Sequence, residues 1–324
     1  MTVYRLGFHG VQVMQIQEAL GKLGLYRGPR DGDFGGGTQA AVIAFQRKSG
    51  LAADGRVGPK TREKLFGANA QVPAQPTASE ELAQRCLALT GSFETGTGAP
   101  DCFCGISGDF DGQGISFGVL QWNFGQRSLQ PLLREVLGEH REVVAAIFHD
   151  HLEALEAALA ASDEELMDFA RSVQHPVKHV VYEPWRGYAK ALGRTPEFQR
   201  IQVKHANGAF QRALALCREY DVSSERAVAL MFDIVVQNGS IRSVTRAQIL
   251  AEMRMLPDAL SADEREVRKL EIIANRRAEA ANPRWVDDVR RRKLCIARGK
   301  GTVHGIAYDI EEQFGITLRR HSLP

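Results

Sequence analysis

Residues 31–38 read Asp-Gly-Asp-Phe-Gly-Gly-Gly-Thr, and residues 54–61 read Asp-Gly-Arg-Val-Gly-Pro-Lys-Thr. Both octets fit one pattern, Asp-Gly-x-apolar-Gly-x-x-Thr, so this part of the chain contains an internal repeat. An Asp-Gly pair is a turn signal, and the second glycine permits another reversal of the backbone. Thr38 and Thr61 then stand where each can cap a following helix. The repeat therefore predicts two similar turns, each leading into a helix.

Apolar residues with helical spacing surround the two turns. Short apolar runs follow each octet, at residues 41–45 and 65–66. An earlier helix is predicted because four apolar residues share one face at helical spacing: Val13, Ile16, Leu20 and Leu23. Three short helices joined by two similar turns predict a compact module over residues 1–67.

This pattern resembles the three-helix peptidoglycan-binding domain of bacterial and phage wall hydrolases. The resemblance covers residues 4–67 and rests on both octets together with Leu6-Gly7, Gln15-Ile16-Gln17, Leu23-Gly24 and Phe45-Gln46. It implies that the module binds bacterial peptidoglycan, with Asp31 and Phe34 as candidate contacts. Turn formation alone explains each glycine and aspartate of the octets, so the binding function rests on the whole pattern.

Residues 68–79 are small, polar and proline-containing, which is the composition of a linker. Thr77 and Glu80 form a capping-box pattern that predicts the start of a helix, so we expect a second domain over residues 80–324. Its sequence is mainly helical. Further helix signals are capping boxes at Ser162/Glu165 and Ser261/Glu264 and a helix from Ser223 or Ser224 to Gly239.

One stretch of the second domain departs from the helical pattern. Residues 91–125 are rich in Gly, Asp, Ser and Phe, which favours turns and short strands. We therefore predict a mainly α protein, in which a three-helix module precedes an α+β domain with a small β-region and a large helical lobe. This layout is similar to that of the lysozyme superfamily, a likeness of fold that does not by itself establish chemistry.

Two carboxylates stand out in this stretch. Glu94 follows Phe93 just beyond the expected end of an apolar helix, where apolar surroundings would disfavour its charged form and let it act as an acid. Asp111 lies on a glycine-flanked turn, with Asp109 two residues away. Hydrolysis of a glycosidic bond needs one carboxyl to protonate the leaving oxygen and another to act on water or on carbon. The residues therefore predict a glycosidase site whose second carboxylate is Asp111 or Asp109.

Glu94 followed by Asp111-Gly112-x-Gly114-x-Ser116-x-Gly118 resembles the catalytic signature of the chitosanase-type glycosidases, a family within the lysozyme superfamily. The resemblance implies Glu94 as general acid, Asp111 as general base and Ser116, in the place of the family's Thr, as a residue that holds the attacking water. Later segments agree in order up to residue 240: Trp185-Arg186, Pro196-Glu197-Phe198-x-x-x-Gln202 and Ala229-x-x-x-Asp233-x-x-x-Gln237-Asn238-Gly239.

Departures from the family pattern leave the sugar specificity open. Gln113 replaces the family's Arg, and residues 120–123 differ from its Gly-rich continuation. Within that segment Gln121, Trp122 and Asn123 are candidate substrate contacts, although packing and turn formation explain them as well. The wall-binding module favours peptidoglycan over chitosan as the substrate.

Bulk properties exclude several other classes. The 324 residues suit a small domain and a large one, and the net charge of +2 gives no indication of a nucleic-acid partner. No segment approaches the run of about 18 apolar residues that spans a membrane, and the N-terminus lacks the apolar core of a secretory signal. We expect a monomer made in the cytoplasm that acts on the wall, in the periplasm, after release or delivery.

Neither a cofactor nor a metal ion is expected. Five cysteines, an odd and sparse set, do not suggest a disulfide framework. His149 with His151, and His175 with His179, have a spacing that zinc ligands can adopt. No HExxH pattern or convincing third ligand accompanies either pair. A Cys-His peptidase with nucleophile Cys102 or Cys104 lacks a recognisable histidine partner.

The sequence thus predicts a muramidase that cleaves the β-1,4 bond between N-acetylmuramic acid and N-acetylglucosamine. The resemblance to the chitosanase-type family implies an inverting mechanism. Chitosanase and lytic transglycosylase are alternative enzymes, and the second needs only the Glu. The non-enzyme alternative is a wall-binding protein with a degenerate hydrolase domain. A phage endolysin and a toxin delivered by a secretion machine fit equally well.

Overall fold

The computed structural model describes residues 3–8, 11–28, 32–67, 81–96, 98 and 101–323. It is 63% helical with small sheets, which confirms the prediction of a mainly α protein. The chain divides into two compact units, one comprising Met1–Gly98 with Gly208–Pro324 and the other Ala99–Asn207. The predicted linker and the Thr77 capping box lie outside the described residues, so the domain boundaries remain a prediction.

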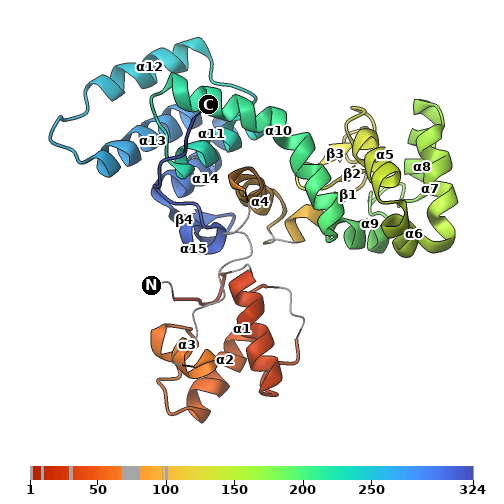
Figure 1. Cartoon of the computed structure of the whole chain (residues 1–324), viewed down its shortest axis with the longest axis horizontal. Helices are drawn as coiled ribbons and strands as arrows, with labels where there is room; N and C mark the ends of the chain where they lie inside the picture. The colour runs from red at the N-terminus through yellow and green to blue at the C-terminus, as the bar shows by residue number, and fades with distance from the viewer. Residues whose placement is uncertain are drawn as a thin grey trace. The chain divides into compact units, whose positions relative to one another are not determined.

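The first unit begins with the predicted three-helix module, α1 (Val11–Lys22), α2 (Gly36–Lys48) and α3 (Pro59–Phe66) (Figure 1). Val13, Ile16 and Leu20 are buried in its core, as their spacing predicts. Leu23 is 48% exposed, because α1 ends at Lys22 and Leu23 lies beyond the helix.

The first octet closes around a buried glutamine of α1. The Gln17 Oε1 atom accepts from the amide of Gly32 at 2.9 Å. Its Nε2 atom donates to the carbonyl of Asp33 at 2.9 Å and to the hydroxyl of Thr38 at 3.1 Å. Gly32 has a φ of 77°, a conformation that favours glycine. The glutamine amide thus ties the turn to the helix before it.

Gln46 of α2 repeats the arrangement in the second octet. Its Oε1 accepts from the amide of Gly55 at 2.9 Å, and its Nε2 donates to the Arg56 carbonyl at 2.9 Å and the Thr61 hydroxyl at 3.1 Å. Gly55 has a φ of 69°. The sequence repeat is therefore a repeat of one hydrogen-bonding device.

The predicted role of the two threonines as helix caps is wrong. Gly35 and Gly58 are the N-cap residues of α2 and α3, and neither helix has a side-chain cap. Thr38 and Thr61 lie inside the first turns, where each hydroxyl bonds a glutamine amide. The threonines are thus fixed by tertiary contacts and not by helix capping.

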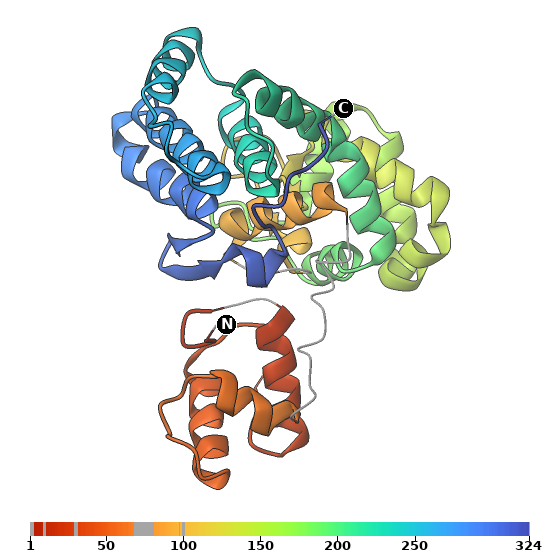
Figure 2. The same cartoon turned by 60° about the vertical axis from the view of Figure 1, so that its left-hand side comes forward.

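The rest of the first unit is helical apart from a two-stranded hairpin. α11 is its central helix, with every residue from Ala227 to Val235 buried. Ser224 caps α11 and Gly239 ends it, as predicted, and Ser261 with Glu264 forms the predicted capping box of α13. α13 and α14 pack side by side (Figures 1 and 2). The elements are α4 (Leu82–Thr95), α11 (Glu225–Asn238), α12 (Ser243–Arg254), α13 (Ala262–Glu279), η4 (Pro283–Trp285), α14 (Val286–Arg298), β4 (Lys300–Val303), β5 (Ile306–Asp309) and α15 (Ile310–Phe314).

The second unit holds the small β-region predicted within residues 91–125. β1 (Ile106–Ser107), β2 (Ser116–Phe117) and β3 (Trp122–Asn123) form an antiparallel sheet in the order β1-β2-β3. The prediction is wrong for residues 91–95, which continue α4. Of the short helices in this unit, α5 and α9 contact the strands. The helices are η2 (Asp101–Cys104), α5 (Leu129–Glu139), α6 (Arg141–Phe148), η3 (His149–His151), α7 (Leu152–Ala160), α8 (Asp163–Ser172) and α9 (Trp185–Gly193). The unit boundary at Asn207 falls inside α10 (Pro196–Glu219).

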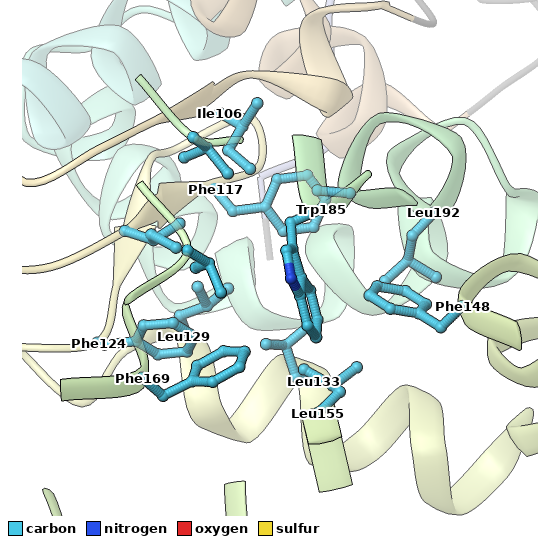
Figure 3. Close-up of a pocket in the computed structure, with 14 residues that line it drawn as sticks. Ile106, Phe117, Phe124, Leu129, Leu133, Phe148, Leu155, Phe169, Trp185 and Leu192 are labelled. Carbon is cyan, nitrogen blue, oxygen red and sulfur yellow. The ribbon is translucent and has the colours of Figure 1, made fainter. Parts of the chain in front are cut away.

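Side chains of the sheet and helices form the core of the second unit. Phe117 of β2 stacks on Phe198 of α10 with ring centroids 5.3 Å apart. A cavity of about 50 Å³ remains in this core, bordered by Trp185, Phe169 and other apolar side chains (Figure 3). Because its lining offers almost no hydrogen-bonding groups, this cavity does not suit a sugar, whose hydroxyls need polar partners.

Further observations concern a helix cap, the cysteines, membrane helices and metal-ligating residues. Ser162 and Glu165 form the predicted capping box of α8. All five cysteines are buried thiols. Among the described residues, no helix is long and apolar enough to cross a membrane, and no cluster of three or more His, Cys, Asp or Glu side chains could hold a metal ion.

Candidate active site

Glu94 belongs to the last turn of α4, not to the segment beyond it. Its neighbour Phe93 is buried, whereas the Glu94 side chain is 39% exposed. The Glu94 Oε1 atom accepts a hydrogen bond of 2.6 Å from Nη1 of Arg292 on α14. The surroundings of this carboxyl are therefore ionic on one side and open on another, where the sequence predicts apolar surroundings.

A buried cluster of charges stands behind Glu94. The Arg292 guanidinium donates from Nη2 and Nε to Asp233 of α11, at 2.7 and 3.0 Å. Lys293 Nζ donates to the same carboxylate at 2.5 Å and to Gln237 Oε1 at 2.6 Å. Glu94 and Asp233 balance the charges of Arg292 and Lys293. This balance is what allows three nearly inaccessible ionic groups to remain in the core.

Burial and pairing compete in setting the ionisation of these groups. Burial alone would raise the pKa of Asp233, but the two cations outweigh it and hold that pKa at about 2. Burial lowers the pKa of Lys293 to about 8, although Asp233 opposes the shift. Burial would also lower the pKa of Arg292, yet Asp233 and Glu94 raise it above its ordinary value. Arg292 is thus a fixed cation that orients Glu94.

Packing around the cluster limits its movement. The Arg292 guanidinium lies 5.1 Å from the centre of the Phe93 ring, a cation–π geometry. The Phe93 ring meets Tyr308 edge to face, with centroids 4.8 Å apart. Thr90 donates to Asp233 at 3.2 Å. The end of α4 is therefore held against α11, α14 and β5.

The β-region distinguishes Asp109 from Asp111. The Asp109 carboxylate accepts from the amide of Gly114 at 2.9 Å, and its own amide donates to Gln174 Oε1 at 2.8 Å. Asp111 is exposed and accepts a local bond of 3.2 Å from the amide of Gln113. Asp109 thus builds the turn, while Asp111 presents its carboxylate to solvent.

Gly108 fixes the position of this turn. A Cβ atom at residue 108 would lie 2.2 Å from the carbonyl oxygen of His179 and 2.3 Å from Gln174 Oε1. Both contacts are far closer than any real Cβ contact, so only glycine fits. The turn that carries Asp111 is therefore anchored to residues 174–179.

Ser116 and the segment that follows it lie on neighbouring strands. Ser116 is half-buried on β2, opposite Asn123 of β3. Gln121 Oε1 accepts from the Ser107 hydroxyl, and Gln121 Nε2 donates to the carbonyls of Gly105 and Gly118. Asn123 accepts from the amide of Gln126 at 2.8 Å and is buried.

Within the described residues, Gln121 and Asn123 make side-chain hydrogen bonds, whereas Trp122 does not. It is half-buried and packs against the core of the second unit. Gly118 has a φ of 86°, and an added Cβ there would lie 2.8 Å from Gln202 Oε1 and 3.0 Å from the Trp122 ring. Gln121 and Asn123 have structural roles, as the alternative interpretation of the sequence holds.

Of the two predicted peptidoglycan contacts in the module, the structure describes one. Phe34 is a core residue with 1% exposure, so its side chain lacks the access that glycan contact requires. Asp31 lies outside the described residues.

The structure places the predicted catalytic residues in both units. Glu94 belongs to the first, and Asp111 and Ser116 belong to the second. Their pairing as acid and base therefore stays a prediction.

Sequence reasoning missed Arg292 and Lys293. Both lie beyond residue 240, where the family resemblance offers no landmark. A signal was present, however, because Val289, Arg292, Lys293 and Ile296 share one helical face. Two adjacent basic residues on an apolar face require a buried anion.

Comparison with known proteins begins at the N-terminus. Residues 9–65 match a family model described as "Putative peptidoglycan binding domain". The module resembles that family, as predicted. An N-acetylmuramoyl-L-alanine amidase of Mycobacterium tuberculosis is 42% identical over 64 residues, which are 20% of this chain and 16% of that enzyme. A spore cortex-lytic enzyme of Bacillus cereus is 42% identical over 66 residues, 20% of this chain and 26% of the enzyme. The chain thus spans about a sixth to a quarter of these relatives.

Solved structures cover more of the chain at lower similarity. A chitosanase complex has a TM-score of 0.42 and 16% identity, covering 70% of this chain and 95% of that one. A chitosanase of Gynuella sunshinyii with chitotetraose has a TM-score of 0.42 and 12% identity, covering 71% and 97%. The endolysin of a Burkholderia phage has a TM-score of 0.20 and 15% identity, covering 90% and 99%.

Proposed function

We propose that this protein is a peptidoglycan hydrolase that cleaves the β-1,4 bond between N-acetylmuramic acid and N-acetylglucosamine. The observation that carries the proposal is the Glu94 carboxyl, held by Arg292 at the end of α4 and open to solvent. The match of residues 9–65 to a peptidoglycan-binding family favours the bacterial wall as the place of action. The names of the module's relatives, an amidase and a spore cortex-lytic enzyme, agree with wall lysis.

In the proposed reaction, Glu94 donates its proton to the leaving glycosidic oxygen. Asp111 takes a proton from water as that water attacks the anomeric carbon from the opposite face, and the product has inverted configuration. Ser116 helps to orient the water. The exposed carboxylate of Asp111 supports its choice over Asp109, whose carboxylate accepts from the Gly114 amide.

The module would act by concentrating the enzyme on an insoluble polymer. Tethering raises the local concentration of a catalytic site without changing its chemistry. We place the site of action in the bacterial wall, after release or delivery of the protein.

The Glu94→Gln variant tests the proposal. Glutamine keeps an oxygen that accepts from Arg292 but has no proton to donate as an acid, so we expect lysis of purified walls to fall roughly 10²–10⁴-fold. Glu311→Gln is the matched control, because the Glu311 side chain is 63% exposed on α15. Lysis at the wild-type rate by a folded Glu94→Gln protein would refute the assignment.

Product analysis separates this function from its alternatives. Mass spectrometry of the released glycans shows which sugar carries the new reducing end. N-acetylmuramic acid at that end supports a muramidase, and an anhydro sugar indicates a lytic transglycosylase. Cleavage of chitosan but not of walls indicates a chitosanase. Wall binding without any cleavage indicates a degenerate hydrolase domain.

A further inference from the structure

A polar cavity lies in the first unit, at the end of α11 beside α12 and α13. It has a volume of about 190 Å³ and is lined by Asn238, Ser240, Arg242, Thr245, Arg277 and Ala280. A wider cavity of about 470 Å³ shares Asn238, Arg242 and Arg277 and extends to Trp285 and Asp288. None of the residues proposed above for catalysis lines either cavity.

Two arginines give this cavity its charge. In the part of the chain that the structure describes, neither Arg242 nor Arg277 has a carboxylate partner. The Nε atom of Arg277 is buried without a hydrogen-bond partner, and so is Oδ1 of Asn238. Burial, and then the neighbouring Arg242, lower the pKa of Arg277. Buried polar atoms are almost always satisfied in folded proteins. The Arg277 Nε–H therefore suits an acceptor of a ligand, and the Asn238 oxygen suits a donor.

The acidic group of the cavity does not neutralise the pair. Asp288 is the acidic residue of the lining, and its Oδ1 lies 2.8 Å from His304 Nε2. Two arginines against this one aspartate leave the cavity cationic. A guanidinium pair of this kind suits a carboxylate, which can accept two hydrogen bonds from each fork.

An exposed aromatic ring borders the same cavity. Trp285 is 51% exposed, and the Arg284 guanidinium lies 4.9 Å from its ring centre. A tryptophan combines a large apolar face with a polar N–H, which suits it to binding surfaces. The apolar C–H face of a pyranose ring can pack on such an indole.

The cavity is connected to the candidate active site through α14. Asp288 and Arg292 are four residues apart on this helix, about 6 Å along its axis. Gln237, which lines the wider cavity, accepts from Lys293 of the charge cluster behind Glu94. A ligand here would therefore lie beside the helix that carries Arg292.

We propose that this cavity binds a carboxylate on the stem peptide of peptidoglycan, with Arg242 and Arg277 as the anion-binding residues and Trp285 as the platform for the adjoining sugar. The proposal rests on the function proposed above and narrows its substrate class to an anionic, peptide-bearing glycan. Chitosan carries amines, which the two arginines repel. Residues other than the proposed acid and base would thus select the substrate.

Calorimetric titration of the full chain tests the proposal. The probe is N-acetylmuramoyl-L-alanyl-D-isoglutamine, which carries one free carboxylate, and the neutral comparison is di-N-acetylchitobiose. We expect Arg242→Gln to weaken binding of the muramyl peptide about tenfold or more and to leave chitobiose binding unchanged. Arg242 is exposed, so this change should not disturb folding. Arg254→Gln is the control, because Arg254 is exposed in the last turn of α12, the helix that Arg242 precedes as N-cap residue.

Arg277→Gln gives a second, independent measurement. Because it removes a charge without a partner, it should weaken binding of the muramyl peptide while the melting temperature stays equal or rises. A purely structural arginine would instead lower the melting temperature and leave affinity alone.

The outcomes separate this proposal from the enzymatic one. Equal affinity of wild type and Arg242→Gln for the muramyl peptide, or no binding to the wild type, overturns the carboxylate site even if wall lysis persists. If binding depends on Arg242 but the wild type does not lyse walls, the carboxylate site stands and the hydrolase proposal fails.

Discussion

Replacing Arg292 by methionine tests whether the buried cluster positions Glu94. The Arg292 side chain is 1% exposed and makes its hydrogen bonds to Glu94 and Asp233. Methionine keeps much of the aliphatic volume but removes the charge and every donor. The change should therefore free the Glu94 carboxyl while Lys293 still neutralises Asp233.

The expected magnitudes follow from burial. Removing one partner of a buried ion pair costs about 3–5 kcal/mol, because an uncompensated charge remains. We expect the lower end, about 3 kcal/mol, since Lys293 stays 2.5 Å from Asp233. A displacement of roughly 1 Å at a catalytic group can cost about 10²-fold in rate, so we expect wall lysis to fall by about that factor.

Thermal unfolding followed by circular dichroism, together with wall turbidity, measures both effects. Arg291→Met is the control, because Arg291 is an exposed neighbour on the same helix. Arg292→Lys should be intermediate, since an ammonium keeps the charge but cannot bridge two carboxylates as a planar fork. Arg292→Met with wild-type melting temperature and lysis would refute the positioning role.

Three further predictions concern the base, the module and acid stability. Asp111→Asn should nearly abolish turnover and Ser116→Ala should reduce it less, whereas Asp109→Asn should be mild because asparagine still accepts from the turn; kinetics and proton NMR of the first product test this, and a retained anomeric configuration or an indispensable Asp109 would contradict it. Removing residues 1–79 should weaken action on intact walls and leave hydrolysis of short soluble glycans largely unchanged, and equal loss on both would show one functional unit. Burial would raise the pKa of Glu225, but Arg85 and Arg319 hold that pKa at about 2, below the ordinary value of 4.5. The lowered pKa contributes roughly 3 kcal/mol to the free energy of unfolding above pH 4.5, and this contribution is lost as the pH falls towards 2. Urea midpoints that do not fall from pH 5 to pH 3 would argue against it.

Local signals account for the parts of the fold that the sequence predicts well. Ser162, Ser261 and Ser224 cap their helices because capping needs residues only three positions apart. The limits of helices are harder to predict. The Gly, Ser and Thr residues of 91–95 favour a turn, but packing of Phe93 and Thr90 carries α4 one further turn to Thr95. Glu94 is consequently part of a helix.

The two octets show how a correct pattern can carry a wrong mechanism. Threonine after a turn suggests a helix cap, and the repeat does mark two helix starts. The hydroxyls of Thr38 and Thr61 instead meet Gln17 and Gln46, which are 21 and 15 residues away in sequence. Contacts at that separation leave no trace in local spacing, although the recurrence of glutamine before each octet is itself a signal.

The candidate site illustrates a stronger rule. Asp233 interrupts a run of apolar residues on α11, and a carboxylate at such a position costs too much free energy to remain unpaired. Arg292 and Lys293 interrupt the apolar face of α14 in the same way. Neither anomaly is explicable alone, but each supplies the charge that the other requires. Reading the two helices together would therefore predict their contact from sequence. Because Lys293 also neutralises Asp233, Arg292 can bind Glu94 as well. A residue 198 positions away in sequence thus holds the proposed acid.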